Sequence, residues 1–221
     1  RSLAAVLTGE PVFREQVYPG AILTRVASSH IRVGTFEYLA AQGDLANLKI
    51  LTQYTIQRHY PEIQNDSEAY FEFFRKAGQA QVELVTSWMA LGFIHGVMNT
   101  DNMSIAGETI DFGPCAFMDQ FRFDQVFSSI DQFGRYSYSN QAQITLWNLS
   151  RLGSCLDLLI NNGSTQTAEM LNKELASFGS LFEQRLASKM RKKLGIVSSA
   201  QPEDTNLIRE WLRYLETEQL D

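Results

Sequence analysis

The sequence has few cysteines, no long apolar run and no excess of positive charge. Its 221 residues include 2 Cys and 3 His, and the net charge is −6. Two cysteines, Cys115 and Cys155, are too few for a disulfide-dense secreted scaffold or a four-cysteine zinc site. No apolar stretch approaches the roughly 20 residues of a membrane span, so we expect no membrane partner. We also expect no nucleic-acid partner, because neutralising phosphates needs a basic surface.

Hydrophobic periodicity predicts a mainly α chain, α+β overall, with a few short strands. A composition that is 44% hydrophobic is sufficient for one sizeable core. A β-branched segment after Pro19-Gly20 predicts a strand at 21–27. Residues 118–140 have no clear period and predict a long ordered loop with short helical pieces. Apolar spacings of three and four predict helices at 34–41, 45–60, 66–91, 144–159, 167–194 and 205–218.

The most informative stretch is residues 95–114, HGVMNTDNMSIAGETIDFGP. A long helix leads into His-Gly, then Asp-Asn, a predicted β-hairpin over 103–112, and Asp-Phe-Gly. This is the order of a protein-kinase active site: catalytic loop, hairpin, metal-binding Asp-Phe-Gly. Each motif alone is common, and Asp101-Asn102 is also compatible with a simple hairpin cap. Their combination in this order favours the kinase-like interpretation, with His95 as a hydrogen-bonded loop anchor.

Two oxygen-bearing side chains in this stretch are candidate metal ligands. ATP is bound with Mg²⁺, a hard cation that prefers oxygen ligands in octahedral geometry. A hairpin that brings the Asn102 amide and the Asp111 carboxylate together would supply two of them. The sequence therefore predicts ATP as substrate and Mg²⁺ or Mn²⁺ as cofactor, held by Asn102 and Asp111.

One position departs from the protein-kinase pattern. Kinases place a catalytic Asp two residues after the His and a metal-binding Asn seven after it. Counting from His95, the seventh residue is Asn102, which fits, but the second is Val97, which cannot accept a proton. Asp101 is the only acid in the loop. Three hypotheses follow: a nucleotidyltransferase, a phosphotransferase with a shifted base, and a catalytically dead pseudokinase that acts as a binding module.

Three segments resemble the selenoprotein O family: residues 95–114, LTRVASSHIRVGTFEYLA at 23–40, and GRYSYSNQAQITLWNLSRL at 134–152. The resemblance is good over about 19–159 and weak elsewhere. Members have a kinase-like fold, bind ATP in a flipped orientation and transfer AMP to Ser, Thr or Tyr of proteins. The resemblance implies Asp101 as catalytic base, Asn102 and Asp111 as metal ligands, and ATP and hydroxyl-bearing proteins as partners.

The same resemblance matches Arg25 and Arg32 to the two arginines that hold the far phosphates of the flipped nucleotide. The role is chemically reasonable, because a guanidinium binds phosphate oxygens bidentately and would stabilise a leaving pyrophosphate. The alternative is structural: Arg25 at a strand edge, and Arg32 paired with a surface acid such as Glu37.

The resemblance also implies a domain organisation. We expect residues 1–221 to be a portion of a kinase-like C-terminal lobe, with the active-site part at 19–160 and a helical extension at 161–221. No glycine-rich loop or V-A-I-K-like strand is found, so we expect the N-terminal lobe to precede Arg1 and the chain alone to be inactive. The family would be cytoplasmic in bacteria and mitochondrial in eukaryotes.

Overall fold

The computed structural model describes residues 2–64, 66–160 and 165–220. The chain divides into two compact units, Arg1–His30 and Ile31–Asp221. The expected boundary between the active-site part and the helical extension falls on residues 161–164, which lie outside the described residues.

The first unit is an antiparallel hairpin of β1 (Ser2–Phe13) and β2 (Val17–Arg25). The predicted strand at 21–27 is confirmed as β2, which begins four residues earlier. Strand β1 was not predicted, because Gly9 and Pro11 are turn-associated residues. It accommodates them through an irregularity of register between Leu7 and Pro11.

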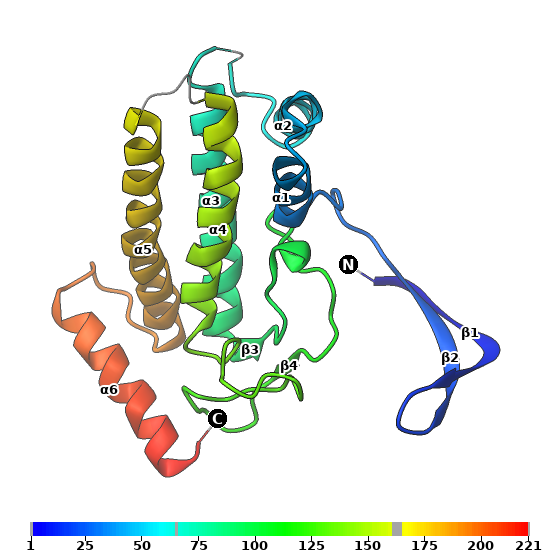
Figure 1. Cartoon of the computed structure of the whole chain (residues 1–221). Coiled ribbons are helices and arrows are strands. Elements are labelled where there is room, and N and C mark those ends of the chain that lie inside the picture. The colour runs from blue at the N-terminus through cyan, green and yellow to red at the C-terminus, as the bar shows by residue number, and fades with distance from the viewer. Residues whose placement is uncertain (1, 65, 161–164, 221) are drawn as a thin grey trace. The chain divides into compact units, whose positions relative to one another are not determined.

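The second unit contains a bundle of three long helices: α3 (Ala69–Ala90), α4 (Gln141–Ile160) and α5 (Thr165–Lys193). They lie side by side and pack pairwise (Figure 1). Helices α1 (Val33–Ala41) and α2 (Leu45–His59) both contact α4. Helix α6 (Glu203–Glu218) packs on α5. The mainly helical prediction is thereby confirmed.

The core of this unit lies where the three helices meet. Gly78 of α3 faces the ring of Phe178 from α5, and any side chain there would clash with it. The rings of Phe74 and Phe178 meet edge to face, with centroids 5.4 Å apart. Such close packing fixes α5 against α3, the helix that leads into the 95–114 segment.

Two structural details differ from the sequence prediction. Strands β3 (Phe93–Ile94) and β4 (Ala116–Phe117) pair antiparallel on either side of the 95–114 segment. The expected hairpin over 103–112 is reduced to one antiparallel bridge between Met103 and Thr109. The physical reason is that its backbone groups bond elsewhere: the nitrogen of Ile105 donates to Ile31 (2.9 Å), and the oxygen of Ile105 accepts from Tyr60 Oη (3.1 Å).

The loop at 118–140 is ordered, as predicted, but it contains no helical piece within the residues the structure describes. Backbone nitrogens of Phe121 and Phe123 donate to the Leu220 carbonyl (2.8 Å) and the Glu216 carboxylate (2.9 Å). These contacts tie the loop to the end of α6. None of the described helices combines the length and the apolar character that a bilayer crossing requires.

Candidate active site

His95 joins the two ends of the 95–114 segment. Its side chain is fully buried, with Nε2 2.7 Å from the carbonyl of Ile110 and Nδ1 3.4 Å from the nitrogen of Val97. Burial lowers the pKa of His95 below its ordinary 6.5, against the opposing effects of the Ile110 carbonyl and the Asp111 charge. A neutral ring that donates from Nε2 and accepts at Nδ1 satisfies both contacts. The predicted role of His95 as a loop anchor is confirmed.

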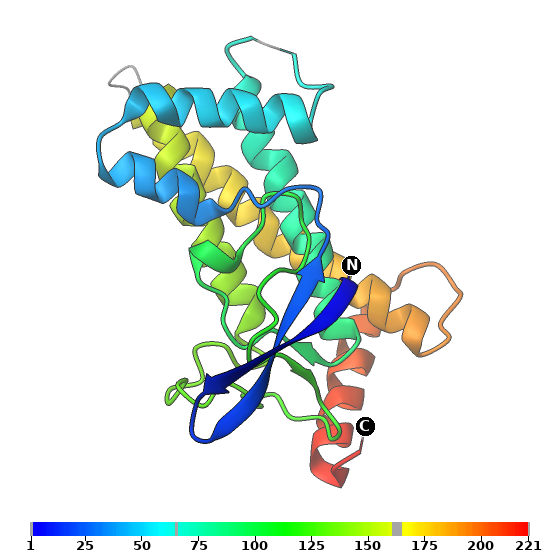
Figure 2. The same cartoon turned by 90° about the vertical axis from the view of Figure 1, so that its right-hand side faces the viewer.

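The residues at the start of α1 pair with the middle of the 95–114 segment. Arg32 and Ser104 make an antiparallel bridge, and the nitrogen of Val33 donates to the carbonyl of Met103 at 3.0 Å. Figure 2 shows α1 beside the green active-site segment. Arg32 and the Asp101-Asn102 pair are thus held by adjoining stretches of backbone.

Asp101 and Asn102 lie on a single 3₁₀ turn, Thr100–Asn102, which packs against α1. The approach is close at Gly34, where a Cβ would stand 3.0 Å from the nitrogen and 3.2 Å from the Cα of Asp101. Those are backbone atoms, so they have little room to give way. Glycine at position 34 therefore lets the turn sit directly on the helix. The Asp101 side chain is exposed, as a group that meets a substrate must be.

Asp111 has a backbone conformation that only glycine adopts freely. Its φ is 53°, in the left-handed region. For a residue with a Cβ this conformation costs roughly 1–2 kcal/mol. It is held there by its neighbours: the Ile110 carbonyl is bound to His95, and Thr109 is bound through its hydroxyl to Trp88 Nε1 at 3.0 Å. Asp111 is also exposed.

The residues present fit a divalent cation with few protein ligands. Asn102 Nδ2 donates to the Val97 carbonyl at 3.2 Å, so the amide oxygen is the atom of Asn102 that would bind a cation. Asp111 supplies one carboxylate. Within the described ranges no cluster of three His, Cys, Asp or Glu side chains forms a metal site. Mg²⁺ suits this arrangement, since it usually takes one or two side chains and completes its shell with phosphates and water.

The two candidate arginines lie in different units. Arg25 ends β2 in the first unit, and in a two-stranded hairpin either strand is an edge, as the structural alternative supposed. Arg32 is half-buried in the second unit. The alternative that pairs it with Glu37 is wrong, because Glu37 bonds Arg151 instead, with 2.5 Å between Oε1 and Nε. Among the described residues Arg32 makes no ion pair.

Two amides on α4 also support the active-site segment, and the sequence analysis missed them. Gln141 accepts from the nitrogen of His95 (3.1 Å) and donates to the carbonyl of Phe93 (3.0 Å). Asn148 donates to the carbonyl of Met98 at 2.9 Å. Both side chains are fully buried. The signal that could have found them is two polar residues, seven apart, on the apolar stripe of an amphipathic helix.

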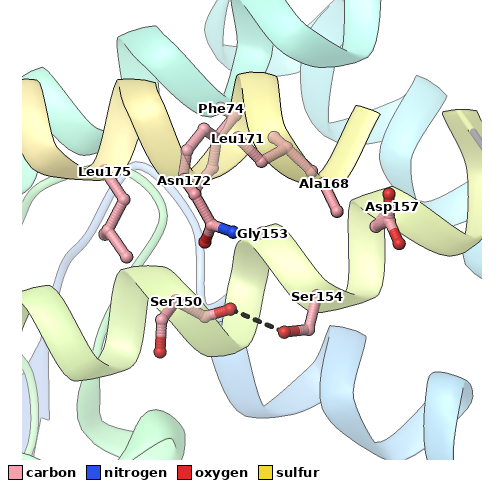
Figure 3. A pocket seen from close by; sticks show the side chains of 9 residues that line it. All are labelled: Phe74, Ser150, Gly153, Ser154, Asp157, Ala168, Leu171, Asn172 and Leu175. Carbon is pink, nitrogen blue, oxygen red and sulfur yellow. Dashed lines mark hydrogen bonds between the residues drawn. The ribbon is translucent and has the colours of Figure 1, made fainter. Parts of the chain in front are cut away.

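A cavity of about 170 Å³ lies elsewhere, among α3, α4 and α5 (Figure 3). None of the five candidate site residues lines it. Its Ser154 hydroxyl bonds the Ser150 carbonyl within the helix at 2.9 Å, and the Gly153 backbone faces the Phe74 ring. Asp101, Asn102 and Asp111 therefore lie on the loop segment at 95–114 and not at this cavity.

Comparison with known proteins gives the family. The family model described as "Protein adenylyltransferase SelO" matches residues 1–221. The chain is 54% identical over 215 residues to "Protein nucleotidyltransferase YdiU" of Rhodopseudomonas palustris (strain TIE-1). It is 50% identical over 221 residues to the protein of that name from Nitrosococcus oceani, and 47% identical over 221 residues to that from Rhizobium meliloti.

These alignments extend the similarity well beyond 19–159. They cover 97% of this chain for the Rhodopseudomonas protein and 100% for the other two. They cover only 44% or 45% of the relatives, so the chain spans less than half the length of the curated proteins it matches. Because the family model covers every residue of the sequence, the chain belongs to the Protein adenylyltransferase SelO family.

Proposed function

We propose that the full-length protein transfers AMP from ATP to Ser, Thr or Tyr hydroxyls of other proteins, in a kinase-like and metal-dependent site. The observation that carries this proposal is the arrangement of the 95–114 segment, in which Asp101 and Asn102 share one turn and Asp111 is held with φ 53°. A strained non-glycine residue, kept in place by surrounding contacts, is a recurrent property of functional sites. The family and the printed names of the relatives support nucleotide transfer in general.

In this proposal each residue has one task. Asp101 accepts the proton of the acceptor hydroxyl, whose oxygen attacks the α-phosphorus. The bond between the α-phosphorus and the bridging oxygen breaks, and pyrophosphate leaves. Asn102 and Asp111 would hold Mg²⁺ or Mn²⁺, which neutralises phosphate charge. Arg25 and Arg32 would bind the departing β- and γ-phosphates.

The proposal extends to organisation and location. Residues 19–160 would form the active-site part of a kinase-like C-terminal lobe, and 161–221 a helical extension. The relatives named above are bacterial proteins, and cytoplasm is the location that we propose for a bacterial member.

Labelled ATP separates the possible reactions. With an acceptor protein present, ATP labelled at the α-phosphate should label protein, and ATP labelled at the γ-phosphate should not. The reason is that Val97 stands where a kinase has its base, while Asp101 and Arg32 lie on adjoining backbone stretches. Autoradiography after gel electrophoresis is the measurement. Retention of the γ-label alone would establish the phosphotransferase, and nucleotide binding without either label would leave a pseudokinase.

Gly34→Ala should slow the reaction while leaving the fold intact. The added methyl would meet the Asp101 nitrogen at 3.0 Å and displace the turn by tenths of an ångström. Misplacing a reacting group by about 1 Å costs on the order of 100-fold, so we expect a loss of roughly tenfold in kcat. Alanine stabilises a helix by about 1 kcal/mol relative to glycine, and this gain should offset the destabilising strain of the close contact.

The matched control is Gly179→Ala in α5, where no atom beyond the neighbouring residues and the helix's own backbone lies within 4 Å of the added Cβ. This variant should keep full kcat. Initial rates of AMP transfer and the midpoint of thermal unfolding are measured for both. If Gly34→Ala kept the full rate, close packing of α1 on the turn would have no catalytic importance.

A further inference from the structure

The loop between β4 and α4 has a tip, defined here as residues 130–136, whose backbone is held by hydrogen bonds. The Asp131 carboxylate accepts from the backbone nitrogens of Arg135 (2.9 Å) and Tyr136 (2.7 Å). Gly134 supplies a left-handed turn with φ 67°, and its carbonyl accepts from Asn140 Nδ2 at 2.7 Å. The tip is thus closed on itself by side-chain to backbone hydrogen bonds.

This held tip presents two large apolar side chains to solvent. Phe133 is 95% exposed and Ile130 is 79% exposed. Single exposed apolar residues are ordinary on protein surfaces. Two of them on one tip, whose backbone is fixed by hydrogen bonds, instead form a preorganised apolar contact surface. Preorganisation matters because a rigid contact residue loses little conformational freedom on binding.

The tip is connected directly to the catalytic turn. The hydroxyl of Tyr136 donates to the side-chain oxygen of Asn99. The carbonyl of Asn99 in turn accepts from the nitrogen of Asn102 at 2.9 Å, and this bond closes the turn that carries Asp101. Arg135 lies over the Tyr136 ring (5.6 Å) and over the Trp147 ring of α4 (4.9 Å). The tip and the turn that carries Asp101 are therefore held to each other by hydrogen bonds.

We propose that Phe133 and Ile130 form a docking point for an apolar side chain of the protein acceptor, close in sequence to the hydroxyl that receives AMP. The proposal rests on the proposed function and names the kind of acceptor segment that the site would select. We favour an acceptor protein as the occupant because hydrogen bonds through Tyr136 and Asn99 hold the tip to the turn that carries Asp101. In the proposed function the acceptor hydroxyl reacts at that turn.

A peptide set tests this directly with the full-length protein. Each peptide carries one tyrosine in an alanine-rich background, with leucine placed at each flanking position in turn. Wild type should prefer one leucine position, with KM for that peptide about tenfold below that of the leucine-free peptide, the order expected for burying part of a leucine. Phe133→Ser or Ile130→Ser should abolish this preference through KM, not kcat.

Val197→Ser is the matched control, because Val197 is 99% exposed in the connection before α6. It should retain the leucine preference. Thermal unfolding midpoints of the variants should equal that of wild type, since the replaced side chains make few contacts.

Several results would overturn the docking point while leaving AMP transfer intact. These are equal labelling of all peptides by wild type, an unchanged preference in Phe133→Ser, or a lower molecular mass of Phe133→Ser in sedimentation, which would assign the tip to a second copy. Failure of maleimide to label Phe133→Cys at position 133, located by mass spectrometry, would show that another part of the polypeptide covers the tip. No labelling of any acceptor, peptide or protein, would overturn the proposed function itself.

Discussion

Asp111→Asn in the full-length protein is expected to lower Mg²⁺-dependent AMP transfer by about 100-fold or more, the effect of losing a few kcal/mol of charge stabilisation at the phosphates. Asparagine is the informative replacement, because it tolerates left-handed backbone and should keep φ near the observed 53°. Alanine at this position would add backbone strain to the loss of charge. Asp111→Asn thus tests the carboxylate alone.

The loss should appear first as weaker binding of ATP with Mg²⁺. Calorimetric titration at several Mg²⁺ concentrations is the measurement, alongside initial rates. Asp119→Asn is the matched control, since Asp119 is exposed, lies outside the Asp-Phe-Gly motif and follows β4 in the next loop. An Asp111→Asn protein with wild-type rate and wild-type Mg²⁺ dependence would show that the metal is held by other groups.

Helices were predicted well because their signals are local. Helix α2 was predicted to start at 45 and does so, directly after Asp44, whose carboxylate caps it by accepting from the nitrogen of Asn47 at 3.1 Å. Helix α4 was predicted to start at 144 and starts at Gln141. Gln141 belongs to the buried face through hydrogen bonds and not through apolar character, so hydrophobic periodicity could not include it.

Strand pairing was predicted poorly because it depends on partners distant in the chain. Two-residue strands such as β3 and β4 have no periodicity to read. The hairpin expected over 103–112 failed for a related reason: its backbone bonds Ile31 and Tyr60, which the local pattern cannot reveal. Local β propensity was present, but long-range contacts decided the pairing.

The candidate site residues were likewise predicted from local motifs, whereas their conformation depends on contacts that the sequence does not reveal. Asn102 was predicted from its spacing after His95, Asp111 from the Asp-Phe-Gly motif, and Asp101 as the only acid of the loop and from the family resemblance. The structure adds that Asp101 and Asn102 share a single turn. The left-handed backbone of Asp111 had no sequence signal, since aspartate is rarely selected for that conformation alone. The tip at residues 130–136 had no sequence signal either, because the exposure and order of Phe133 depend on the hydrogen bonds of Asp131.

Asp101→Asn should lower kcat and leave nucleotide binding nearly unchanged, whereas Asp111→Asn should weaken nucleotide binding as well. Asp101 is exposed on the turn and has no metal to hold in the proposal, so nucleotide affinity should change by less than about threefold. Removal of a general base costs typically 10²- to 10⁴-fold, and the loss should lie in kcat. Asparagine keeps the size of the side chain and its ability to sit on the 3₁₀ turn.

The acceptor gives this prediction its decisive test. A tyrosine phenol has a pKa of about 10, whereas a serine hydroxyl is a much weaker acid and depends more on a base. If Asp101 accepts the proton during attack, Asp101→Asn should lose more rate on a serine peptide than on the matching tyrosine peptide. Single-turnover rates with both peptides, and with Asp119→Asn as control, measure the difference. Equal losses on the two acceptors would mean that Asp101 orients the acceptor or the nucleotide, and that the proton leaves by another route.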